Sequence, residues 1–278
     1  KYDELVARDP KSADILKPIL RGRDIKRYKA DWAGLYLVAT FPARQLDIDD
    51  YPAVRDYLKS FGPALDQSGA PGSRKRTANK WFETQDAIAY WQDFEKPKVM
   101  WTDMAQRSSF LFDIAGCICV NTGYFFCGNS LKYFTAVLNS ILMDNYFKMI
   151  SMDIQGGTSR FFKIYVEQLP IPDIPLAQQR PFEVLVDAIQ LAKREGCELE
   201  ADFLENLADW LVYGLYFEEE ARALRQADYI RFIAGTAQNP ANTDLVFRKQ
   251  GLLPRSELVP LMKKRLEEMG RVVCVETV

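Results

Sequence analysis

Histidine is missing from this chain, and none of its 278 residues is a His. Without an imidazole, the chain cannot build a Ser-His-Asp triad or a Cys-His pair. Zinc and iron sites that depend on His ligands are excluded for the same reason. Any catalysis by this chain would have to use carboxylates, lysine, tyrosine or cysteine.

Long apolar runs and nucleotide-binding motifs are also lacking. No run approaches the roughly 20 residues of a membrane helix, so we expect a soluble, cytoplasmic protein without membrane contact. There is no GxGxxG, P-loop or GxSxG motif; Gly156-Gly157-Thr158-Ser159 lacks the P-loop lysine and spacing. The chain begins with Lys1 rather than Met and shows no signal peptide, so we expect a piece of a longer polypeptide.

The five cysteines do not form a disulfide framework. Their number is odd and they are scattered, which indicates a reducing compartment. Cys117 and Cys119 share one face of a predicted strand, with Cys127 nearby, and could hold a metal. No CxxC pair or His completes such a site, so we predict buried small side chains and no metal site.

The composition is that of an ordinary globular protein, but the charge is divided unevenly. The net charge is −2, with +3 in residues 1–170 and −5 in residues 171–278. Two basic clusters lie in the first part, RGRDIKRYK from Arg21 and RKRTANK from Arg74. They indicate either a polyanion-binding surface or simply a solvated charged face.

The periodicity predicts an α+β protein with two domains. Residues 1–175 would form a mixed or antiparallel sheet domain, and residues 176–278 an α-helical region. After an irregular lead-in over residues 1–33, the predicted elements of the first domain are strands over 35–41, 98–102, 109–114, 117–126 and 161–168, and helices over 51–61 and 131–150. Those of the second are helices ending at Gly196 and covering 199–217, 218–233 and 256–269, with a loop over 235–252.

Carboxylates are plentiful, but none is marked as catalytic. Asp47, Asp49 and Asp50 precede a predicted helix, where capping explains them better than a metal site. Asp93, Glu95 and Lys96 are too close together for a nuclease centre, which needs acids from separate elements. We therefore assign no catalytic residue.

A DNA-binding set is better supported. Arginine and lysine neutralise phosphates, while forked and amide side chains read base edges. A Gly-rich loop, QGGTSR from Gln155, offers backbone N–H groups and hydroxyls to a phosphate, although a plain tight turn explains it equally well. The candidate DNA contacts are Arg21, Arg23, Arg27, Arg74, Arg76, Asn79, Lys80, Arg107, Gly157, Thr158, Ser159 and Arg160, and we expect the basic ones to share one face.

Several segments, taken in order, resemble a known family. They are PILRGRDIKRY from Pro18, WAGLYLV from Trp32, YPAVRDYL from Tyr51, KWFETQ from Lys80, PKVMWTDM from Pro97, QGGTSRFFKIYVEQLPIPDIP from Gln155 and LADWLVYGLYFEEE from Leu207. Over about residues 10–235 this set is similar to the TaqI-like C-terminal specificity domain of adenine-N6 DNA methyltransferases and Type IIG restriction-modification enzymes. Residues beyond about 235 fall outside the resemblance.

The resemblance implies a target recognition domain that binds double-stranded DNA. The catalytic methyltransferase domain, with its S-adenosylmethionine site, would be covalently linked on the N-terminal side, and any endonuclease would also lie outside this region. This chain itself would hold no cofactor. The helices after the proline-rich connector resemble the spacer or dimerisation helices of Type I specificity subunits.

Two other functions remain open on the sequence alone. The near-neutral total charge is compatible with a protein-interaction module that has no nucleic-acid role. A carboxylate-dependent hydrolase would need two acids in one pocket, and the sequence shows no such pair.

Overall fold

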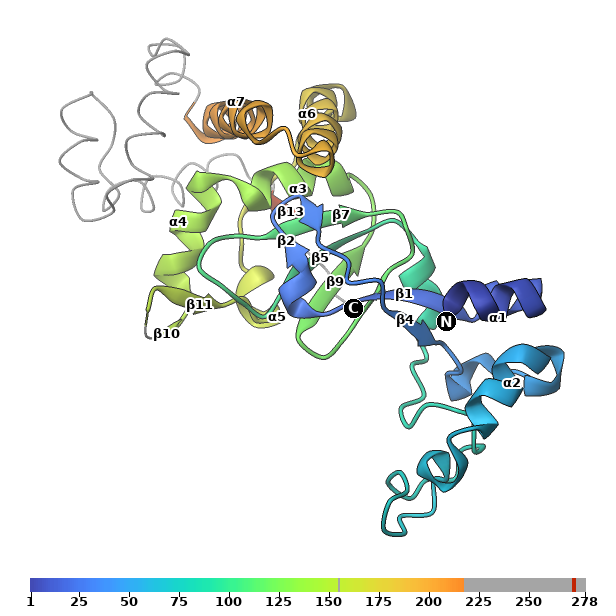
Figure 1. Cartoon of the computed structure of the whole chain (residues 1–278). Helices are drawn as coiled ribbons and strands as arrows, with labels where there is room; N and C mark the ends of the chain where they lie inside the picture. The colour runs from blue at the N-terminus through green and yellow to red at the C-terminus, as the bar shows by residue number, and fades with distance from the viewer. Residues whose placement is uncertain (155, 218–271, 274–278) are drawn as a thin grey trace. The chain divides into compact units, whose positions relative to one another are not determined.

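The computed structural model describes residues 1–154, 156–217 and 272–273, which form an α+β fold (Figure 1). The contacts divide these residues into two compact units. Unit 1 contains Lys1–Arg21, Trp32–Pro97 and Asp113–Val120. Unit 2 contains Gly22–Asp31, Lys98–Phe112 and the described residues from Asn121 onward. The chain therefore passes between the units several times.

Unit 1 is built on a three-stranded mixed sheet. Its central strand, β1 (Leu16–Leu20), is antiparallel to β4 (Tyr36–Val38) and parallel to β8 (Ile118–Cys119). Helix α1 (Tyr2–Arg8) precedes the sheet, and α2 (Pro52–Lys59) follows β4. The parallel pairing brings a segment from beyond residue 113 into this unit.

A small apolar core holds unit 1 together. Val54 and Leu58 lie four residues apart on one face of α2, and both are buried. They belong to a cluster with Leu5 of α1, Ile15 and Phe82. Pro52 begins α2, where a missing backbone N–H has no cost.

Unit 2 contains another three-stranded sheet, with the strand order β7-β5-β9. Strand β5 (Lys98–Thr102) lies between β7 (Phe110–Asp113) and β9 (Gly123–Cys127). The β5–β9 pairing is antiparallel and runs from Lys98 opposite Cys127 to Thr102 opposite Gly123.

Smaller sheets complete unit 2. Strand β11 (Thr158–Arg160) lies between β10 (Asp153–Ile154) and β6 (Met104–Ala105), and both pairings are antiparallel. Two more antiparallel pairs are β2 (Ile25–Lys26) with β3 (Lys29–Ala30) and β12 (Ile171–Pro172) with β13 (Val272–Val273).

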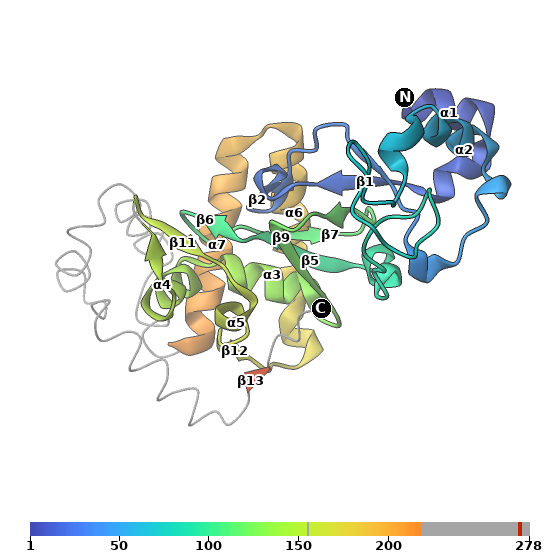
Figure 2. The ribbon, with the colours of Figure 1, turned by 90° about the horizontal axis from the view of Figure 1, so that it is seen from below.

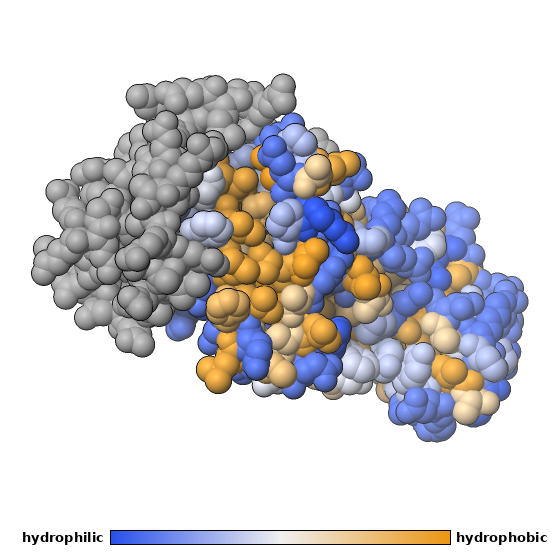
Figure 3. All heavy atoms as spheres, turned by 90° about the horizontal axis from the view of Figure 1, so that it is seen from above, coloured by the Kyte–Doolittle hydropathy of each residue, from blue (hydrophilic) through white to orange (hydrophobic). Residues whose placement is uncertain are grey.

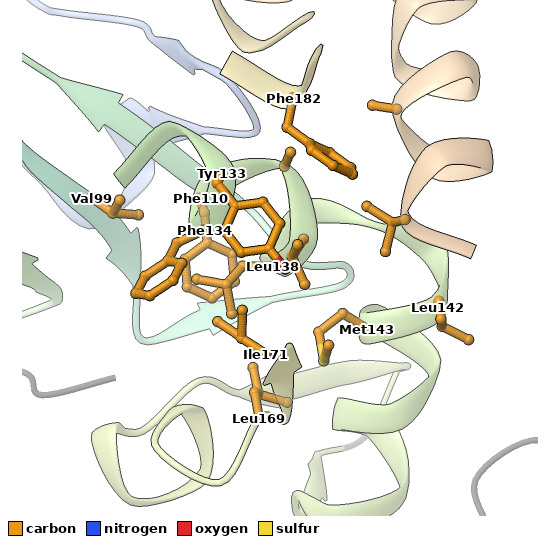
Figure 4. Packing of buried hydrophobic residues seen from close by; sticks show 14 of the residues in the cluster. Val99, Phe110, Tyr133, Phe134, Leu138, Leu142, Met143, Leu169, Ile171 and Phe182 are labelled. Atoms are coloured by element: carbon orange, nitrogen blue, oxygen red, sulfur yellow. The ribbon is translucent and has the colours of Figure 1, made fainter. Parts of the chain in front are cut away.

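Helix α3 (Leu131–Asn139) forms the middle layer of unit 2. It contacts β5 on one side and both α6 (Leu176–Glu195) and α7 (Glu198–Tyr216) on the other, as Figures 1 and 2 show. The buried core runs through this layer, and Figure 4 shows Phe134 and Leu138 of α3 lying among Val99, Phe110 and Phe182.

The predicted helix over 131–150 is two helices. Helix α3 ends at Asn139, and α4 (Ile141–Ile150) begins after Ser140, whose backbone is extended. The Ser140 hydroxyl accepts the N–H of Met143 at 3.1 Å and so caps α4. The apolar period continues through the break, which is why periodicity alone did not reveal it.

Other sequence expectations have mixed outcomes. The strand over 98–102 is confirmed as β5, and the helices ending at Gly196 and covering 199–217 are confirmed as α6 and α7. The strand over 117–126 is divided into β8 and β9. The strand over 35–41 is shortened to β4, and that over 109–114 to β7.

Two further expectations are wrong. The lead-in over 1–33 is not irregular, since it contains α1 and β1; the Lys and Pro of β1 (LKPIL) conceal its strand pattern. The strand over 161–168 is instead the short helix α5 (Lys163–Val166). Phe161 and Val166 are buried there while Ile164 is exposed, which does not match the alternation of a strand.

The predicted division at residue 175 is not a boundary of either compact unit. Phe182, Leu185, Val186 and Val212 of α6 and α7 join the same core cluster as Val137 of α3. The expectations for the helix over 218–233, the loop over 235–252 and the helix over 256–269 lie outside the described residues.

One buried side chain joins the α3–α4 corner to the sheet of unit 2. The Asn139 amide accepts the N–H of Phe110 at 2.9 Å and donates to its carbonyl at 2.8 Å. We expect Asn139→Ala to lower the free energy of unfolding by about 2–3 kcal/mol, because the buried Phe110 N–H loses its acceptor. Urea unfolding measures this effect. Asn145→Ala, on the half-exposed side of α4, is the control and should stay within about 0.5 kcal/mol of wild type.

Candidate nucleic-acid interface

The first basic cluster is partly a structural element of unit 2. Residues 25–30 form the β2–β3 hairpin, and Tyr28 is buried at a positive φ of 60°. The backbone N–H of Tyr28 donates to the Phe110 carbonyl at 3.0 Å. Arg23 and Lys26 point to solvent, whereas Arg27 is buried. This basic cluster therefore supplies both surface charge and a buried contact.

Arg27 of the β2–β3 hairpin is the centre of a buried ion network whose acids lie on α7. Its Nε donates to a carboxylate oxygen of Glu205, and its Nη1 donates to the Asn139 carbonyl. Lys193 of α6 lies 2.7 Å from the other oxygen of Glu205. Arg107 lies 3.6 Å from Glu205, and its side chain is 57% exposed. Arg107 is thus the outermost base of this network.

The network shifts the pKa values of its members in opposite directions. Burial alone would raise the pKa of Glu205, but the charges of Arg27 and Lys193 outweigh it and lower that pKa. Burial raises the pKa of Asp209, one turn further along α7, to about 6. The neighbouring Arg27 charge lowers the pKa of Arg107. The network thus contains three cations, Arg27, Lys193 and Arg107, and two acids, Glu205 and Asp209. Arg107 is the cation of this network that reaches the surface.

Arg107 follows a strand that pairs with the Gly-rich turn. In the β6–β11 pairing, Ala105 lies opposite Ser159 and Met104 opposite Arg160. Arg107 is two residues beyond β6, the strand that pairs with β11, and Arg160 is the last residue of β11. Arg160 also lies 5.0 Å over the ring of Phe162.

The turn before β11 is shaped by its glycines. Gly156 and Gly157 have φ values of 88° and 73°, which side-chain-bearing residues rarely adopt. Both are exposed and Thr158 is half-buried, so their backbone groups face solvent. Ser159 is only 1% exposed, so its hydroxyl is not at the surface.

The second basic cluster lies in a long loop of unit 1 that is fixed from within. Gln67 is 8% exposed, and its amide donates to the carbonyls of Lys80 at 2.9 Å and Glu83 at 2.8 Å. Its Oε1 accepts the Thr77 hydroxyl. Asn79 donates to the carbonyls of Thr84 and Gln85, both at 2.9 Å. The segment thus has a defined shape despite lacking helix or strand.

These contacts leave only some of the basic side chains of the loop facing solvent. Arg74 donates to the Glu83 carbonyl at 2.9 Å, and Lys80 donates to the Leu46 carbonyl at 3.2 Å. Lys75, Arg76 and Lys80 are exposed, whereas Arg74 is half-buried. Arg76 is therefore the member of the predicted set on this loop for which no structural role is evident.

The predicted contacts consequently fall into two groups. Burial removes Arg27 and Ser159 as direct DNA contacts, and Arg74 and Asn79 act within the loop. The predicted residues that remain at a surface are Arg76 and Lys80, with half-buried Arg21, in unit 1, and Arg23, Arg107, Gly157, Thr158 and Arg160 in unit 2. A single face shared by both groups stays a prediction.

Several residues with clear roles were missed. Glu205 and Asp209 hold the ion network, and Gln67 holds the loop. A usable signal existed for the two acids, since Glu205 and Asp209 fall among the buried positions Ala201, Ala208 and Val212 of α7. An acid at such a position predicts a buried partner. Gln67 has no comparable sequence signal.

The described part of the chain shows no arrangement typical of a metal site or a membrane span. Within residues 1–154, 156–217 and 272–273, no three His, Cys, Asp or Glu side chains are grouped so as to hold a metal ion. Across the same residues, no helix is both long and apolar enough to cross a bilayer. Of the described cysteines, Cys117 is buried, Cys119 and Cys127 are half-buried and Cys197 is exposed, so the prediction of buried cysteine side chains is confirmed for Cys117 and wrong for the other three.

Comparison with known protein families identifies a match to the region that holds these residues. The family model for the TaqI-like C-terminal specificity domain matches residues 17–171, which is more than half of the chain. The match includes both basic clusters and the Gly-rich turn. No curated protein matches the chain.

Gln67→Ala should release the basic loop. Its loss leaves the carbonyls of Lys80 and Glu83 and the Thr77 hydroxyl without their shared partner, at a local cost of about 2–3 kcal/mol. Hydrogen exchange should accelerate over residues 66–85, and trypsin should cut sooner after Arg76. Gln85→Ala, which removes one exposed bond of 3.3 Å to the Lys75 carbonyl, is the control. Equal protection in both variants would contradict this role of Gln67.

Asp209 predicts a characteristic pH dependence of stability. Its pKa is raised from 3.8 to about 6 in the folded state, so its contribution is most favourable below pH 4 and is lost as the pH rises through 6. The unfolding free energy of wild type relative to Asp209→Asn should therefore fall by about 2–2.5 kcal/mol between pH 4 and pH 7. Exposed Asp202→Asn is the control, and a pH-independent difference for Asp209→Asn would refute the prediction.

Proposed function

Since the chain belongs to the TaqI-like C-terminal specificity domain family, we propose that it recognises duplex DNA through its surface arginines and lysines. The family membership gives the chain a DNA-recognition role of the restriction-modification type. The family match is the observation that carries the proposal. The exposed lysine and arginine side chains in the matched region support the proposal, because phosphate neutralisation supplies much of the affinity for DNA.

The two loop regions would contribute in different ways. The loop over residues 66–85 presents Lys75, Arg76 and Lys80 from a hydrogen-bonded frame, so little ordering entropy opposes binding. Around the β6–β11 pairing, Arg107, Arg160 and the exposed backbone of Gly156 and Gly157 would contact phosphate oxygens. Arginine at either place also has the forked geometry that reads guanine in the major groove.

We further propose that the reader serves a linked adenine-N6 methyltransferase of Type IIG character, in the cytoplasm. The reaction requires the target base to leave the stack, so the recognition domain would hold a distorted duplex. The sequence has no Gly-rich strand-turn for S-adenosylmethionine, and we place that cofactor, and any endonuclease, in the linked part. No catalytic step is assigned to this chain.

The proposal is tested on two exposed basic residues of the loop, Arg76 and Lys80. Arg76→Ala combined with Lys80→Ala should weaken binding to a 30-base-pair duplex of random sequence, because two phosphate contacts are lost. The slope of log K against log salt should become shallower by up to about 1.8. Fluorescence anisotropy at several salt concentrations gives both quantities.

Lys59→Ala removes an exposed base at the end of α2, outside the candidate set, and is the matched control. It should leave both affinity and slope near those of wild type. Wild-type binding that is absent at low salt, or that does not depend on salt, would overturn the proposal and favour a protein-interaction module.

A further inference from the structure

Helix α7 carries apolar side chains on two opposite sides. Its inner side buries Ala201, Ala208 and Val212 in the core of unit 2. On its opposite side, Leu199, Phe203, Leu207 and Trp210 follow one another at spacings of four, four and three residues, which is a single stripe on a helix. A surface helix with one buried face normally has a polar outer face, so this second stripe requires an explanation.

The stripe is open to solvent at its start. Leu199 is 84% exposed and Phe203 is 54% exposed, while Leu207 and Trp210 are half-buried and pack against the core cluster of unit 2, so the open part of the stripe is Leu199 and Phe203. On neighbouring α6, Val184 and Leu191 are 52% and 50% exposed. Figure 3 views unit 2 from the side of α6 and α7 and shows hydrophobic side chains gathered there. A contiguous exposed apolar area of this kind marks an interaction surface.

The charge beside the stripe has one dominant sign. Residues 194–203, around the start of α7, contain four acidic residues and one basic residue. Three of these acids, Glu198, Glu200 and Asp202, are on α7 and exposed, and α7 contains no Lys or Arg. The apolar stripe is therefore bordered by negative charge where it is most exposed.

We propose that the outer stripe of α7 binds an amphipathic helix of a partner polypeptide whose apolar side chains are flanked by lysine or arginine. A partner helix matches the helical spacing of the stripe, and its apolar anchors would cover Leu199 and Phe203. Basic flanks would meet Glu198, Glu200 and Asp202 and so select this partner over others of the same apolarity.

The same charges argue against two other occupants. The phosphates of DNA would be repelled by Glu198, Glu200 and Asp202, so the stripe is distinct from the basic loops. A second copy that paired α7 with α7 would bring these acids close to their equivalents, which costs affinity. The partner inferred here is independent of the proposed DNA-recognition function.

The experiment uses the full chain and three labelled synthetic helical peptides. The first has a leucine stripe with lysine flanks, the second the same stripe with glutamate flanks, and the third lysine flanks with serine in place of leucine. We expect the first to bind, as followed by fluorescence anisotropy, and the other two to bind at least tenfold more weakly. Equal binding of the first two would overturn the charge argument, and equal binding of the first and third would overturn the apolar one.

Variants then locate the binding to α7. Phe203→Glu should weaken the lysine-flanked peptide at least tenfold, because an anchor becomes charged. Ile164→Glu alters a similarly exposed apolar side chain on α5 (61% against 54% for Phe203) and should leave binding unchanged. Glu200→Lys with Asp202→Lys should reverse the preference toward the glutamate-flanked peptide. Equal loss in Phe203→Glu and Ile164→Glu would overturn the assignment to α7.

Light scattering and thermal unfolding test the other occupants. A wild-type dimer that becomes monomeric in Phe203→Glu would mean that a second copy occupies the stripe. Absence of peptide binding to wild type, together with a lower Tm of Phe203→Glu, would mean that the chain itself covers the stripe. Either result overturns the proposal, and neither bears on the salt-dependent DNA binding.

Discussion

The ion pair between Arg27 and Glu205 is the interaction on which unit 2 depends. It joins the β2–β3 hairpin to α7, two segments 178 residues apart. Arg27 also donates to the Asn139 carbonyl at the α3–α4 corner, where the Asn139 amide binds both backbone groups of Phe110. Removing one member of such a pair leaves the other charge buried and unpaired, which is strongly destabilising. The buried pair thus fixes hairpin, sheet and helices in one arrangement.

This use of arginine explains why charge counting overstated the DNA surface. RGRDIKRY contains four bases, yet Arg27 is buried and Tyr28 fills core space at a positive φ. Gly22 in the same run is needed for space, since a Cβ there would lie 2.7 Å from the Thr122 carbonyl oxygen. In the second cluster, Arg74 stabilises the loop that carries Arg76. In each cluster, a basic side chain that holds the backbone lies within a few residues of a basic side chain that faces solvent.

The sequence predicted the parts of the fold that leave a local pattern. Strand β5 and helices α6 and α7 followed from apolar periodicity, because each buries a regular set of side chains. The break at Ser140 and the division of 117–126 depend on hydrogen bonds and pairings with distant segments, which no local pattern contains. The parallel pairing of β1 with β8 joins residues about 100 positions apart and was hidden for the same reason. At the candidate site, residue type made Arg27, Arg76 and Arg107 equal candidates for DNA contact. Only the structure shows that Arg27 is buried while Arg76 and Arg107 are exposed.

The uneven charge along the sequence corresponds to a division of surfaces. The exposed lysine and arginine side chains lie on loops whose backbone is fixed by Gln67 or by the β6–β11 pairing. The exposed acidic side chains of α7 border an apolar stripe. A polyanion is attracted to the loops and repelled from α7, so one ligand cannot occupy both. Lys193 and Glu205 connect the two kinds of surface, because Glu205 binds Arg107 of the loop while its helix carries the stripe.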